Sequence, residues 1–168
     1  MGPDPIVAIY RAALPHVYGY LLPRCGSVAV AEDLTAETFT AAVAAMRQGE
    51  MGELTIGWLV GVARHKLVDH WRQVGREERG LSVIERQQVD SGDPWDEVLD
   101  LDAAHAALRR LPLQQRLALT LRYLDGLSVP EVAAQLGRTV HGTETLLVRA
   151  RAALRRVYEE EERDERSA

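Results

Sequence analysis

Apolar residues recur every three or four positions along most of this 168-residue chain, the spacing that gathers them on one face of an α-helix. The first half of the chain predicts three helices of this kind. The apolar stripe of the first consists of Ile6, Ile9, Tyr10, Leu14, Val17 and Leu21. This helix ends between Pro23 and Gly26, and Pro15 within it is expected to cause a kink. The second runs from about Val28 to Arg47, ahead of Gly49.

A third, longer helix follows Thr55, whose hydroxyl is suited to cap it, and extends to about Arg76. Its apolar face consists of Ile56, Leu59, Val60, Ala63, Leu67, Trp71 and Val74. Its other face carries Arg64, His65, Lys66, His70, Arg72 and Gln73. Three helices of roughly 20 residues predict a small helical bundle.

The helical pattern breaks over residues 75–102, which are strongly acidic and contain a glycine–aspartate–proline turn. We interpret this stretch as a linker with at most short helical pieces. Trp95 and the apolar cluster of Val98, Leu99 and Leu101 are expected to dock on another surface. The expected fold is all-α, with two small helical domains at residues 1–78 and 103–158. The acidic linker then covers residues 79–102, and an acidic tail covers residues 159–168.

The second half of the chain has the helix start and stop signals of a helix-turn-helix over residues 111–156. Pro112 opens a helix that stops before Gly126. Residues 128–131 read Ser-Val-Pro-Glu, which is a capping box that begins a helix of about eight residues. Gly137 is suited to end that helix in a left-handed conformation, and Thr139 is suited to cap the last helix. A short capped helix, a tight glycine turn and a second capped helix are the parts of this motif.

In such a motif the second helix places its N-terminal residues in the major groove of DNA. Here those residues are Arg138, Thr139, Val140, His141, Thr143, Glu144 and Thr145. Four arginines follow that can reach phosphates, namely Arg149, Arg151, Arg155 and Arg156. An ordinary helical hairpin is the competing interpretation. The short first helix, the turn chemistry and the local positive charge together favour DNA binding.

The net charge of −5 is unusual for a DNA-binding protein until it is divided along the chain. Residues 101–157 carry 9 basic and 4 acidic side chains, a net charge of +5. Residues 75–100 carry 3 and 8, and residues 158–168 carry 2 and 6, so acidic stretches flank a basic domain. Of the 20 basic residues only Lys66 is a lysine. The codon usage of a GC-rich genome explains this bias better than a need for phosphate-binding arginine forks.

Several other classes of protein are disfavoured. No apolar run is long enough to span a bilayer, and the N-terminus lacks the pattern of a secretory signal. Cys25 is the single cysteine, so no internal disulfide forms, and we expect a cytoplasmic location. The five histidines and Cys25 have no metal-ligand spacing. Neither a nucleophile–base arrangement nor a phosphate loop is present. We therefore expect a protein that is not an enzyme and needs no cofactor.

Particular segments resemble a known family. Residues 108–112, 121–128 and 131–133 resemble region 4 of bacterial sigma factors, and residues 148–155 are similar to the end of that region. Upstream, residues 31–39 resemble region 2.2, and the segments at 58–59, 63–64 and 66–70 resemble regions 2.3 and 2.4. Their order and spacing, without a middle domain, are typical of the extracytoplasmic-function (ECF) class of the sigma-70 family. The resemblance covers about residues 6–78 and 103–157.

The resemblance implies partners and roles. It implies core RNA polymerase, promoter DNA and an anti-sigma factor as partners. The residues implied to bind polymerase are Glu32, Asp33 and Glu37. Those implied to bind the −10 element are Arg64, His65, Lys66 and Arg72. Those implied to bind the −35 element are Arg138, Thr139, His141, Thr143, Glu144, Arg149 and Arg151.

This chain departs from the family pattern at four positions. Ala36 stands where the family often has Gln, and His65 stands where it usually has Asn. Glu144 and Leu146 stand where Lys and Arg are common, so the recognition helix has fewer cations and is expected to bind DNA weakly by itself. Glu144 either accepts a hydrogen bond from cytosine N4 or is solvated or paired with an arginine. His141 likewise either touches DNA or is simply exposed.

Other expectations concern single residues and the acidic stretches. Trp58 and Trp71 are better explained by core packing than by stacking on bases. Asp69 is expected to pair with an arginine. The acidic linker either threads a basic polymerase channel or serves solubility, and both interpretations stay open. Residues 159–162 are expected to extend the last helix and then fray.

Two alternative functions remain at this stage. A sigma-like mimic would only sequester an anti-sigma factor, and the cation-poor recognition helix is compatible with it. A polymerase-independent helix-turn-helix regulator is the other alternative, and the acidic residues Asp33 and Glu37 argue against it.

Overall fold

The computed structural model describes residues 2, 4–49, 52–80 and 100–168. These residues form α-helices and one π-helical turn, with no strand among them, which confirms the all-α prediction. The chain divides into two compact units, residues 1–93 and 94–168. In chain order the helices are α1 (Pro5–Cys25), α2 (Val28–Arg47), α3 (Ile56–Gly80), α4 (Asp100–Arg109), α5 (Leu113–Leu119), the π-helical turn η2 (Thr120–Leu124), α6 (Val129–Leu136) and α7 (Val140–Ser167).

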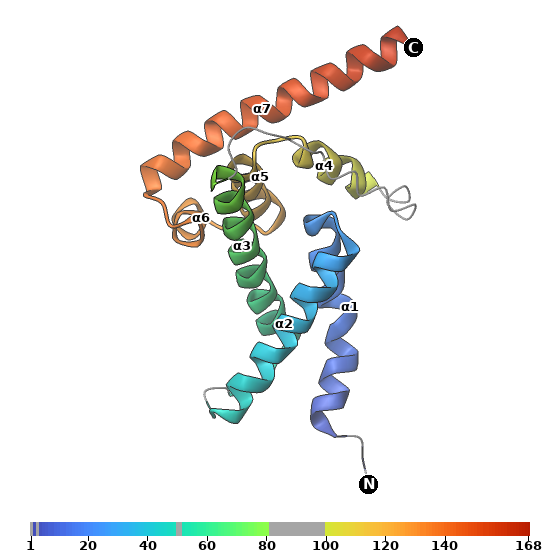
Figure 1. Ribbon diagram of the computed structural model, residues 1–168, viewed down its shortest axis with the longest axis vertical. Coiled ribbons are helices and arrows are strands. Elements are labelled where there is room, and N and C mark those ends of the chain that lie inside the picture. The colour runs from blue at the N-terminus through green and yellow to red at the C-terminus, as the bar shows by residue number, and fades with distance from the viewer. Residues whose placement is uncertain (1, 3, 50–51, 81–99) are drawn as a thin grey trace. The chain divides into compact units, whose positions relative to one another are not determined.

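The first unit is a bundle in which α1, α2 and α3 each pack on the other two (Figure 1). Local caps determine where these helices begin. The Asp4 carboxylate accepts a hydrogen bond from the Ile6 amide, and the Thr55 hydroxyl accepts one from the Trp58 amide. The predicted three-helix bundle is confirmed, although α1 continues through Pro15 and α3 runs to Gly80.

Small and branched apolar side chains, together with one tryptophan, form the core of this bundle. They are Ala13, Val17, Leu21, Ala31, Leu34, Ala42, Leu59, Ala63, Leu67, Val68 and Trp71. Thr35 and Thr38 are also buried, and each hydroxyl donates to the backbone carbonyl four residues earlier, so neither leaves an unpaired polar group in the core. Trp71 packs in this core as predicted, whereas Trp58 is half-buried.

The second unit contains the predicted helix-turn-helix. Ser128 and Glu131 form both hydrogen bonds of the capping box at the start of α6. Gly137 ends α6 in the left-handed conformation, with φ 64°. Thr139 caps α7 by accepting a hydrogen bond from the Gly142 amide at 3.0 Å. Because α7 packs on both α5 and α6, the motif has a buried side and an exposed side.

Three features of this unit differ from the sequence-based expectation. The stretch interpreted as linker contains the start of α4, which packs on α5 and α7. The helix after Pro112 widens into the π-helical turn η2 before Gly126. The acidic tail does not fray, because α7 continues to Ser167. The expected docking of Trp95, Val98 and Leu99 falls outside the described residues, and so does the side chain of Leu101.

The acidic tail of α7 is also attached to the rest of the unit. The guanidinium of Arg110, just after α4, lies 2.9 Å from the Glu160 carboxylate and 3.3 Å from that of Glu161. All three side chains are 43–59% exposed, so each pair contributes well below about 1 kcal/mol. The contacts nevertheless orient the tail toward α4, although 50 residues separate Arg110 from Glu160 along the chain.

Replacing Gly137 by Ala should lower the free energy of unfolding by about 1 kcal/mol, because its φ of 64° is disfavoured for a residue with a Cβ atom. Gly61→Ala is the matched control. Gly61 lies within α3, and a Cβ atom added there would meet nothing within 4 Å. That substitution should instead stabilise the protein by about 0.5–1 kcal/mol. Urea titrations of the two variants, followed by circular dichroism, would reveal the opposite signs.

Candidate nucleic-acid and polymerase interface

The first three turns of α7 present one buried and one exposed face. Thr143, Leu146, Leu147 and Ala150 are buried against the rest of the second unit. The opposite side of the helix is exposed and carries His141, Glu144, Thr145 and Val148. His141 Nδ1 lies 4.0 Å from the Glu144 carboxylate, so the two polar groups adjoin on successive turns. This exposed face provides hydrogen-bonding and apolar groups together at the start of a helix.

Arginines surround this face. Arg138 is exposed just before α7, and Arg149, Arg155 and Arg156 are exposed along it. Arg151 is also exposed, but its guanidinium donates a hydrogen bond to the Tyr123 hydroxyl at 2.8 Å. Tyr123 belongs to the π-helical turn, so this bond ties η2 to α7. The arrangement suits a polyanion, because exposed arginines lie on more than one side of this face.

The acidic residues of α2 lie on its exposed surface. Asp33 and Glu37 are one turn apart and share a face, away from the buried Ala31 and Thr38. Glu32 is exposed as well, but its neighbouring position turns it by about 100° from Asp33. The structure therefore brings Asp33 and Glu37 together and separates Glu32 from them.

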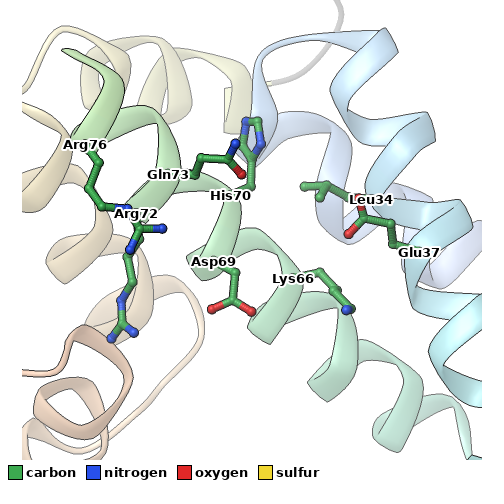
Figure 2. Close-up of a pocket in the computed structure, with 8 residues that line it drawn as sticks. All are labelled: Leu34, Glu37, Lys66, Asp69, His70, Arg72, Gln73 and Arg76. Atoms are coloured by element: carbon green, nitrogen blue, oxygen red, sulfur yellow. The ribbon is translucent and has the colours of Figure 1, made fainter. Parts of the chain in front are cut away.

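An open polar groove with a volume of about 280 Å³ lies between α2 and α3. Figure 2 shows Leu34 and Glu37 of α2 on one side of it, opposite residues of α3. The α3 side is formed by Lys66, Asp69, His70, Arg72, Gln73 and Arg76. The groove thus has an acidic residue of α2 and basic residues of α3 in one lining.

Comparison with known proteins agrees with this geometry. The profile of the family described as Sigma-70 region 2 matches residues 9–77, and that of Sigma-70, region 4 matches residues 101–154. Neither family is a catalytic one. The chain is 36% identical over 169 residues to the ECF RNA polymerase sigma factor BldN of Streptomyces coelicolor, covering 95% of this chain and 62% of BldN. It is 32% identical to the ECF RNA polymerase sigma factor SigD of Mycobacterium tuberculosis, covering 87% of this chain and 72% of SigD.

This chain belongs to the ECF sigma factors of the sigma-70 family. A solved structure supports the same assignment. It contains the sigma factor RpoE of Bartonella quintana in complex with the anti-sigma factor NepR, and its sigma chain has a TM-score of 0.56 and 25% identity to this one. The match covers 89% of this chain and 94% of that chain. Within the described part of this sigma factor, no helix combines the length and apolar character needed to cross a membrane.

The structure changes the candidate −35 surface of this sigma factor at two positions. Thr143 is fully buried and its hydroxyl donates to the Thr139 carbonyl at 2.9 Å, so Thr143 is removed from that surface. Leu146 belongs to the core, so its difference from the family pattern does not alter the exposed face. Arg138, Thr139, His141, Glu144, Arg149 and Arg151 remain exposed. Spacing already indicated the correction, because Thr143 is three and seven positions before the apolar Leu146 and Ala150.

The candidate −10 residues of the sigma factor do not form one patch. Lys66 and Arg72 line the groove, and His65 is exposed on α3. Arg64 is half-buried on the side of α3 that carries Ala63, Leu67 and Val68. Asp69 is exposed, and its expected pairing with an arginine stays a prediction.

Gln73 and Arg76 are groove residues that our sequence-based set of site residues omitted. A usable signal was present, because Lys66, Asp69, Gln73 and Arg76 recur every three or four positions on one side of α3. No pattern in the sequence indicated that Glu37 of α2 lines the same groove as these residues, since this depends on how α2 packs on α3.

Proposed function

We propose that this ECF sigma factor binds core RNA polymerase and directs it to promoters that have −10 and −35 elements. The observation that carries the proposal is the exposed, arginine-flanked start of α7, within a chain whose other unit matches sigma region 2. BldN and SigD, which are named as RNA polymerase sigma factors, support the polymerase as partner. The chain spans 62% of the length of BldN.

The polymerase-binding surface we propose is the face of α2 that carries Asp33 and Glu37, with Glu32 at its side. Acidic groups on adjacent turns are suited to pair with basic side chains of a partner. Their exposure supports the assignment, because each carboxylate is available to a second protein.

Two DNA contacts are proposed. Lys66 and Arg72 at the groove provide a cationic rim for melted bases of the −10 element, and His65 and Arg64 are proposed as further contacts from other sides of α3. Arg138, Thr139, His141, Glu144, Arg149 and Arg151 provide the −35 contact, with Glu144 as an acceptor for cytosine N4. When one promoter element is bound, the other is held close to its binding surface at a high effective concentration. A weak −35 contact is therefore sufficient in the polymerase complex.

We further propose that an anti-sigma factor restrains this protein, and that it acts in the cytoplasm by binding rather than by catalysis. The RpoE–NepR complex supports the first point, since its sigma chain shares the fold of this one. The limits proposed for the linker are residues 79–102, which include the whole interval between the two matched segments except residue 78.

In vitro transcription with core RNA polymerase on fragments of the source genome tests this proposal. Adding the protein should produce transcripts that start at defined sites, and these should be absent with core polymerase alone. The protein by itself should bind the same fragments weakly. Promoter-independent tight DNA binding would instead favour the regulator, and a stable anti-sigma complex without any transcript would favour the mimic.

A further inference from the structure

The centre of the exposed face of α7 is an apolar side chain, Val148, which is 58% exposed. Its position lies opposite the buried Leu146 and Ala150. His141 precedes it by seven residues, or two helical turns, so both side chains project from the same side. A single exposed valine is common on protein surfaces. The surroundings of Val148 therefore decide whether it has a function.

Those surroundings fit DNA better than an apolar protein surface. Val148 stands among polar and charged exposed neighbours: Glu144, Thr145, Arg149, Arg151 and Arg155. Residues 101–157 carry nine basic and four acidic side chains, which favours a polyanionic partner. Val148 follows the helix cap Thr139 by nine residues, or roughly 13 Å along the axis. That length is comparable to the width of the major groove, about 12 Å.

We propose that Val148 packs against the 5-methyl group of a thymine in the −35 element and so determines specificity at that base pair. Apolar side chains recognise thymine in the major groove through this methyl group. Glu144 lies one turn earlier on the same exposed face of α7. Its proposed contact with cytosine would therefore be made from the same side of the helix. One helical turn of about 5.4 Å corresponds to one or two base pairs. The thymine therefore lies within one or two base pairs of the base read by Glu144.

This inference rests on the proposed sigma function, and its test begins with the holoenzyme. Core polymerase with the full chain selects promoters from a library in which the −35 region is randomised. In a selected promoter, each thymine of that region is then replaced by deoxyuridine, which removes only the methyl group. One such replacement should weaken promoter binding by about fourfold, the effect of losing one buried methyl group.

Alanine variants of two exposed valines test whether Val148 is the side chain that contacts this methyl group. With Val148→Ala, the thymine and deoxyuridine promoters should bind equally well. Val7→Ala is the matched control, because Val7 is a 41% exposed valine on α1 in the other unit. It should retain the full fourfold difference.

Different failures have different meanings. A fourfold methyl effect that persists in Val148→Ala would overturn the inference while leaving the sigma function intact. The absence of any methyl-sensitive thymine would do the same, as would an equal loss of binding by Val148→Ala on the thymine and deoxyuridine promoters, which indicates a polymerase contact. A holoenzyme that enriches no promoter would overturn the proposed function and this inference together.

Discussion

The variant Asp33→Arg should lose binding to core RNA polymerase by roughly 100-fold or more, because like charges placed opposite each other at an interface cost several kcal/mol. Asp33 is exposed on α2 and shares its face with Glu37, so an arginine there would face the basic partner proposed for this surface. Asp33→Asn removes the charge without reversing it and should have a smaller effect.

Fluorescence anisotropy of the labelled full chain, titrated with core polymerase in the absence of promoter DNA, measures this effect directly. Glu53→Arg is the matched control, since Glu53 is an exposed acidic residue in the same unit but lies outside α2. It makes the same change in net charge and should bind nearly as well as the unaltered protein. Circular dichroism should show that both variants remain folded. Equal affinities of the Asp33 and Glu53 variants would contradict the assignment of the α2 face.

The second large effect concerns stability. Leu121→Ala should lower the free energy of unfolding by about 3 kcal/mol, because the lost side chain leaves a cavity in a close-packed core. Leu121 is 1% exposed within the π-helical turn η2. Its backbone carbonyl also accepts a hydrogen bond from the Leu127 amide at 3.0 Å, next to the turn that precedes α6.

Leu124→Ala is a close control for this substitution. The two leucines lie in the same π-helical turn, but Leu124 is 39% exposed. Its truncation should cost less than about 1 kcal/mol, since the removed atoms bury little apolar area in the folded protein. Thermal unfolding of the two variants would separate burial from any general sensitivity of the π-helical turn. Similar losses in both would mean that the turn itself, rather than the Leu121 side chain, carries the stability.

Local chemistry explains why so much of the helical architecture was predictable. Thr55, Ser128, Gly137 and Thr139 act on backbone groups within three or four residues of themselves, so their effect is visible in the sequence. The starts of α3 and α7 and both ends of α6 were predicted in this way. By contrast, α4 begins inside the acidic stretch that we interpreted as a linker with at most short helical pieces, and its bounds were not predicted.

The sequence by itself therefore determined the all-α class, most helix boundaries, the helix-turn-helix and, through its motifs, the family. Tertiary packing decided which side chains face a partner. Burial removes Thr143 from the DNA surface and leaves Val148 at its centre, because α7 turns one face onto α5 and α6. Packing of α2 on α3 brings Glu37 to the groove of Lys66, and folding pairs Arg110 with Glu160. Such contacts join residues far apart in the chain, and no local pattern specifies them.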